Sequence, residues 1–133
     1  MIMAYRSKRH ISLVRFFMSA CYFLLNQTKK EIISFLHIPA WKKRELAGNS
    51  ISAAIVTWYL LENMGDSISF INDESDKWPF KYGNFSDLRD YKEVTDQVVD
   101  ALIKAEILKD EGREFYYDDE PDAYDRILRN IWF

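Results

Sequence analysis

The apolar stretch at residues 11–25 constrains the fold of this chain more than any other feature. Its large apolar side chains recur at helical spacing, at Leu13, Phe16, Phe17, Ala20, Phe23 and Leu24. A segment that is apolar over most of a helix circumference has to be buried against other elements. The stretch therefore predicts a central core helix.

Basic residues precede this stretch, as they do in a signal sequence or a membrane anchor, at Arg6, Lys8 and Arg9. Arg15 interrupts the apolar run, and the uninterrupted part at residues 16–25 is about half of the roughly 20 residues that a membrane-spanning helix needs. A buried helix in a protein without membrane contact is the prediction. The single Cys21 cannot form an internal disulfide, which favours a reducing, cytoplasmic compartment.

Capping signals predict two helices after the first. Residues 28–31 have the form of a capping box and start a second helix, which Pro39 ends. Asn49 and Ser50 offer a cap for a third helix that closes at Gly65.

The second half predicts two further helices and two short strands. A clean apolar stripe marks a helix at 93–108, and Pro121 starts a terminal helix in which apolar residues repeat at i, i+3, i+4 and i+7. Residues 67–71 and 113–118 alternate like half-buried strands that could pair. The prediction is a mainly α, compact helical domain of about five helices, with a small two-stranded β-hairpin or wing, over residues 1–133.

Charge divides this single domain into two halves of opposite sign. Residues 1–50 hold nine Lys and Arg and two acids, whereas the remainder holds nine Lys and Arg and nineteen acids. A basic helical half at 1–65 would then face an acidic helix–strand–helix half at 66–133. The pattern favours a basic contact surface, and the alternative of two solvated faces that partly neutralise each other stays open.

The residues 28–46 resemble the first helix, the turn and the start of the recognition helix in helix-turn-helix proteins. In that family the second helix enters the DNA major groove. The resemblance implies that Lys29 and Lys30 contact phosphate, and that Lys42, Lys43 and Arg44 lie on the recognition segment. Trp41 beside them would either pack in the fold or stack on a base. Arg6, Lys8 and Arg9 would add to the same basic surface. A helical hairpin with a solvated basic face is the alternative.

Residues 94–117 resemble the recognition helix and wing of winged-helix domains, although five acids in this unit would repel a polyanion. Asp90, Asp100, Asp110 and Glu111 loosely resemble the carboxylates that hold magnesium in RusA-like resolvases, but Lys92 stands where a second aspartate belongs. No phosphate loop, paired cysteines or histidine pair is present, so neither a cofactor nor catalysis is expected. The leading hypothesis is a non-catalytic nucleic-acid-binding regulator.

An acidic, tyrosine-rich section supports a rival hypothesis. Carboxylates steer the approach of a basic partner and tyrosines anchor it, as in inhibitors, immunity proteins and nucleic-acid mimics. The candidate protein-binding residues are Tyr116, Tyr117, Asp118, Asp119, Glu120, Asp122 and Tyr124. Association with a protein partner or a second copy is therefore an alternative to nucleic acid.

Overall fold

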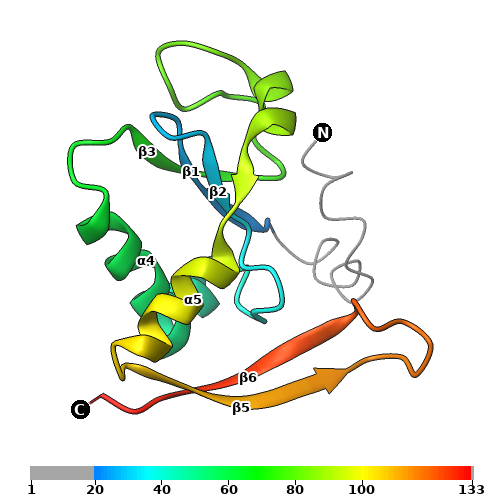
Figure 1. Ribbon diagram of the computed structural model, residues 1–133. Coiled ribbons are helices and arrows are strands. Elements are labelled where there is room, and N and C mark those ends of the chain that lie inside the picture. The colour runs from blue at the N-terminus through cyan, green and yellow to red at the C-terminus, as the bar shows by residue number, and fades with distance from the viewer. Residues whose placement is uncertain (1–19, 133) are drawn as a thin grey trace.

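Strand β1 (Tyr22–Asn26) lies inside a four-stranded sheet in the computed structural model, which describes residues 20–132 (Figure 1). It pairs antiparallel with β3 (Ile68–Asn72) on one side and with β2 (Glu31–Ile33) on the other. The two-residue strand β4 (Lys92–Glu93) pairs parallel with β2, which gives the strand order β3-β1-β2-β4.

Both faces of this sheet are covered, which explains the uninterrupted apolar sequence of β1. Leu24 and Ile33 belong to the core on one face, whereas Phe23, Leu25 and Ile32 belong to the core on the other. Successive side chains of a strand point to opposite faces. A continuous apolar run is therefore what a strand buried on both faces requires.

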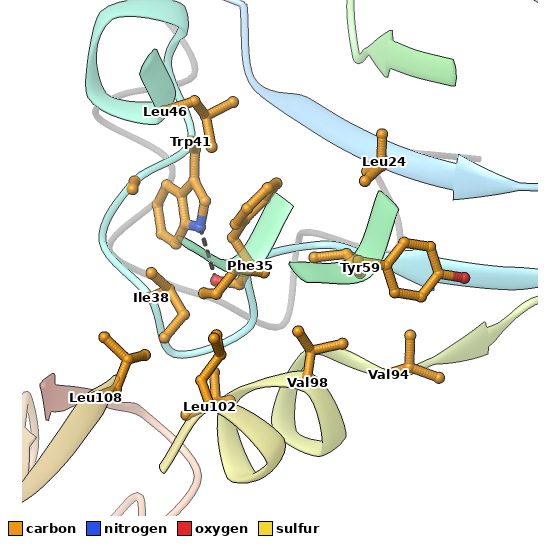
Figure 2. Packing of buried hydrophobic residues seen from close by; sticks show 14 of the residues in the cluster. Leu24, Phe35, Ile38, Trp41, Leu46, Tyr59, Val94, Val98, Leu102 and Leu108 are labelled. Atoms are coloured by element: carbon orange, nitrogen blue, oxygen red, sulfur yellow. Dashed lines mark hydrogen bonds between the residues drawn. The ribbon is translucent and has the colours of Figure 1, made fainter. Parts of the chain in front are cut away.

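Trp41 is fully buried in the larger core, where it lies beside Phe35 and Ile38 (Figure 2). Helices α3 (Lys43–Gly48), α4 (Ser50–Glu62) and α5 (Thr95–Lys104) supply the surrounding side chains. The indole nitrogen of Trp41 donates a hydrogen bond to the Phe35 carbonyl oxygen at 3.2 Å, so the buried polar atom is satisfied. Phe35 is itself fully buried although its φ is +58°, a left-handed conformation that this packing has to maintain.

The segment between β3 and β4 covers the opposite face of the sheet. Its Trp78 ring contacts the rings of Phe80, Phe85 and Tyr91 edge-on. The short 3₁₀ helix η1 (Phe85–Asp90) places Leu88 in the same core. This irregular segment is thus ordered by aromatic packing against the sheet.

The strands β5 (Leu108–Phe115) and β6 (Tyr124–Asn130) form a separate antiparallel hairpin (Figure 1). The hairpin packs on the body through Leu108 and Leu128, and also through His37, whose ring stacks on Tyr124 at 3.7 Å between ring centres. The Tyr124 carbonyl oxygen lies 2.8 Å from His37 Nδ1, and the Arg126 amide donates to the His37 carbonyl oxygen at the same distance. These contacts fix the direction in which the hairpin projects.

The expectation of a mainly α fold is wrong, because the described residues are 31% helix and 27% strand, with four helices and two sheets. The structure is mixed α/β. Of the predicted first helix, the part from Tyr22 onward is strand β1, and residues 11–19 lie outside the described residues. The predicted second helix is also wrong, because residues 28–30 turn the chain into β2.

The predicted terminal helix is wrong as well, since β6 occupies that segment. Pairing with β5 imposes a period of two, so that Leu128 packs on the core while the adjacent Ile127 is exposed. Strand β3 forms as expected, but its partner is β1 rather than residues 113–118. Helices α4 and α5 confirm the third helix and the helix at 93–108, where the apolar periodicity is longest.

Among residues 20–132, no helix combines the length and the apolar character that crossing a membrane requires.

Gly83 tests the packing of the segment that covers the sheet. Its φ is +87°, and an added Cβ would lie 2.6 Å from the Asp87 carboxylate, which accepts a hydrogen bond from the Asn84 amide. We expect Gly83→Ala to lower the free energy of unfolding by about 2–3 kcal/mol in urea denaturation, because strain and crowding add. Gly65→Ala is the matched control, since φ is +90° but no atom lies within 4 Å. Equal losses in the two variants would contradict this account.

Candidate functional site

The basic residues of the nucleic-acid hypothesis do not form one described surface. Lys29 and Lys30 lie in the turn after β1, whereas Lys42 follows Trp41, whose carbonyl oxygen accepts from the Tyr22 amide at the start of β1. The five residues of β1 separate the two groups by about 16 Å along the strand. Arg6, Lys8 and Arg9 lie outside the described residues.

Acidic and amide groups contact Lys29, one of the two residues in the first basic group. The Lys29 ammonium lies 3.5 Å from Asp66 and also contacts the Asn63 side chain. Fully buried Asn26 donates to the same Asp66 carboxylate at 2.8 Å. Lys29 therefore ties the β1–β2 turn to the end of α4, with its ammonium group beside the Asp66 carboxylate.

The second basic group, Lys42, Lys43 and Arg44, is compact, but the adjacent Trp41 is not on its surface. Lys42, Lys43 and Arg44 are consecutive at the beginning of α3, where Lys43 and Arg44 are exposed. Trp41 is fully buried in the core and cannot stack on a base. Helix α3 is only six residues long, and no helix precedes it over residues 28–38. The helix-turn-helix geometry expected at 28–46 is thus absent.

A carboxylate cluster does form in the second half, but a guanidinium group occupies it. Arg126, whose side chain is only 10% exposed, contacts Asp96 at 3.2 Å, Asp110 at 3.3 Å and Asp100 at 3.5 Å. Among residues 20–132, no group of three or more His, Cys, Asp or Glu side chains is arranged to hold a metal ion. The carboxylates of the RusA-like resemblance, Asp90, Asp100, Asp110 and Glu111, therefore build no metal site.

Electrostatics in this cluster stabilise the charged forms. Burial acts to lower the pKa of Arg126, but Asp96, Asp110 and Asp100 outweigh it and raise that pKa. The pKa of Asp110 is held below its ordinary value, chiefly by a hydrogen bond from the Gly112 amide and then by Arg126. The cluster joins α5 to both strands of the hairpin, so its role is structural.

The most uniform charge in the described chain lies at the free end of the hairpin. We call residues 114–125 the acidic hairpin end; they include six Asp and Glu and neither Lys nor Arg. Asp118, Asp119 and Asp122 are exposed, and Glu120 is half-buried. Phe115 and Tyr117 are exposed by 52% and 48% beside these carboxylates. Large aromatic surface and uniform negative charge therefore occur together here.

The other two tyrosines of the predicted protein-binding set support this end from within. Tyr124 stacks on His37, and the Arg113 guanidinium lies 4.4 Å from the centre of the Tyr124 ring. The Tyr116 amide donates to the Ala123 carbonyl oxygen at 3.0 Å, which closes the turn. Tyr124 therefore positions the acidic hairpin end, and its ring is largely engaged by this chain.

Phe115 is the residue that sequence reasoning missed. Strand alternation identifies Phe115 and Tyr117 as one face, but only the pairing of Phe115 with Tyr124 shows that this face lies at the tip. Glu114 and Asp125 likewise join the acidic residues because they are paired across the hairpin. The sequence shows the alternation of Phe115 and Tyr117, but only the register of β5 and β6 shows where these two side chains lie.

Comparison of the chain with protein-family models, with curated proteins and with solved structures finds no significant match.

The Arg126 cluster makes stability depend on pH in a defined direction. Because the folded-state pKa of Asp110 is lowered, its contribution is present above the ordinary Asp pKa and is lost as the pH falls through the lowered value. We expect the unfolding free energy to fall less steeply in Asp110→Asn than in the wild type between about pH 5 and pH 2. Urea titrations at each pH measure this slope. Asp119→Asn, in the exposed turn, is the control, and wild-type and Asp110→Asn slopes that coincide would refute the assignment.

Proposed function

We propose that this chain is a non-catalytic binding protein whose acidic hairpin end engages a basic surface on a partner protein, as an inhibitor or adaptor does. The observation that carries the proposal is the co-location of six carboxylates with exposed Phe115 and Tyr117, without any basic residue between positions 114 and 125. Uniform charge accelerates encounter with an oppositely charged surface, and aromatic anchors slow dissociation.

Strand pairing and ring stacking hold the base of the acidic hairpin end in place, which favours binding with little rearrangement. Cross-strand pairing reaches Phe115 and Tyr124, the last and first residues of β5 and β6, and the His37 stack fixes the base of the turn. A surface that is ordered before binding loses less conformational entropy on association. Figure 1 shows this end of the hairpin projecting away from helices α4 and α5.

A protein partner is favoured over nucleic acid because of where the charges lie. Lys29 is paired with Asp66, and Lys42, Lys43 and Arg44 form a small group without the expected recognition helix. Phosphate backbones require several lysines and arginines along one surface. We place the protein in the cytoplasm as part of the proposal, on the single cysteine in its sequence.

Capture from native lysate with matched charge variants tests the proposal. We expect the variant Asp118→Asn, Asp119→Asn, Glu120→Gln, Asp122→Asn to capture its main partner at least tenfold less than the wild type, as loss of about 1.4 kcal/mol implies. A control neutralises four exposed carboxylates elsewhere, at Glu62, Glu74, Asp76 and Asp90. Both variants change the net charge equally, so only the position of the charge differs.

Two further arms separate protein from nucleic acid. We expect capture to survive nuclease treatment and to persist in Lys42→Glu, Lys43→Glu, Arg44→Glu, while Tyr117→Ala weakens it about tenfold or more. Raising the salt concentration should reduce wild-type capture, because exposed charges are screened. Loss of capture after nuclease, or equal capture by the two neutralised variants, would overturn the proposal.

A further inference from the structure

Helix α4 carries an apolar stripe that no other described element covers. Ser52, Ile55 and Tyr59 point into the core. Residues about half a helical turn away, such as Ala53, Thr57 and Leu61, form the opposite side of the helix. Leu61 on that side is exposed by 61%, Leu60 is exposed as well, and Met64, two residues after the end of α4, is exposed by 79%. A helix that is apolar on all sides is normally buried on all sides.

Two hollows flank this stripe near the middle of α4. One has a volume of about 550 Å³ and lies toward the sheet, between Val56 and the rings of Tyr22 and Phe70. The other has a volume of about 610 Å³ and lies toward the end of β6, between Trp58 and Trp132. Ala53 and Thr57 line both hollows, so they form the ridge between them.

Side chains along the stripe are small in the first half of α4 and large in the second half. Two antiparallel copies of the stripe would therefore fit together. The first half carries small residues, Ser50, Ala53 and Thr57, the second half carries Leu60 and Leu61, and Met64 follows in the turn just after the helix. If two copies of α4 pack antiparallel about Thr57, Leu61 lies opposite Ala53, and Met64, just beyond the end of each helix, lies toward the start of the other copy. Large side chains of each copy then face the small residues and hollows of the other.

We propose that this chain forms a two-fold symmetric dimer through antiparallel contact of the α4 stripes. A two-fold interface uses the same patch on both copies, which requires this kind of self-complementarity. Glu62 is the one charged residue of α4; it is exposed, but the helical wheel places it away from the stripe, whereas Lys43 of α3 lines the first hollow. Figure 1 shows α4 and the acidic hairpin end at opposite ends of the molecule, so dimerisation leaves that end accessible.

The size of the surface sets the strength of the dimer. A 13-residue helix is about 20 Å long, and one helix with two adjacent hollows falls below the roughly 800 Å² per partner that stable complexes bury. We therefore expect a dissociation constant in the micromolar range. Sedimentation velocity of the full chain from about 1 to 300 µM would show a concentration-dependent shift from monomer to dimer.

Charge variants at the proposed symmetry axis test the geometry. Thr57 is exposed, so Thr57→Arg and Thr57→Glu should fold, which circular dichroism and thermal unfolding would verify. Each variant places two like charges face to face and should remain monomeric up to 300 µM, about tenfold or more weaker than the wild type. An equimolar mixture of the two variants should restore the dimer, because opposite charges then meet on the axis.

Gln97→Arg, at an exposed position on α5, is the control and should dimerise like the wild type. A wild type that stays monomeric at 300 µM would overturn the proposal. It would also be overturned if Thr57→Arg still formed dimers, or if the mixture of the two Thr57 variants stayed monomeric.

Discussion

Strand β1 is the constraint on which the rest of this structure depends. It pairs with β2 and β3 along both edges, and its side chains alternate between two cores on opposite faces of the sheet. Because both faces have to be covered, the helices are on one face and the irregular segment with Trp78 is on the other. The hairpin of β5 and β6 is then attached beside the helices rather than added to the sheet.

This arrangement also determines how charge is distributed. The β1–β2 turn and the start of α3 lie at opposite ends of β1, so the basic residues of the first half are divided. In the second half, Arg126 gathers Asp96, Asp100 and Asp110 near the base of the hairpin. The carboxylates of residues 114–125 have no such arginine among them and extend beyond this cluster, which makes the acidic hairpin end distinct from the rest of the acidic half.

Secondary structure was predicted correctly where a long apolar periodicity and the capping residues lie within the element itself. Val98 and Leu102 mark the buried side of α5, and Asn49 caps α4, so both helices can be predicted from their own residues. The segments at 28–38 and 121–132 have apolar spacing that suits a helix. They form strands instead, because β2 pairs with β1 and β6 pairs with β5. Local periodicity cannot reveal a strand partner, and Ile32 and Ile33 serve opposite faces only because β2 lies in a sheet.

The same limit applied to the candidate site. The acidic and aromatic composition of residues 116–124 was visible in the sequence, but the inward role of Tyr124 and the outward position of Phe115 depend on the register of β5 and β6. Trp41 shows the converse case, because the sequence left open whether this residue packs or stacks on a base, and the structure places it in the core.

Amide hydrogen exchange of the chain, alone and bound to its captured partner, tests most directly whether the acidic hairpin end is the binding surface. We predict that binding slows exchange in residues 114–125, because contact with the partner shields those amides from solvent. Unchanged exchange there, together with new protection at Lys42, Lys43 and Arg44, would contradict this assignment.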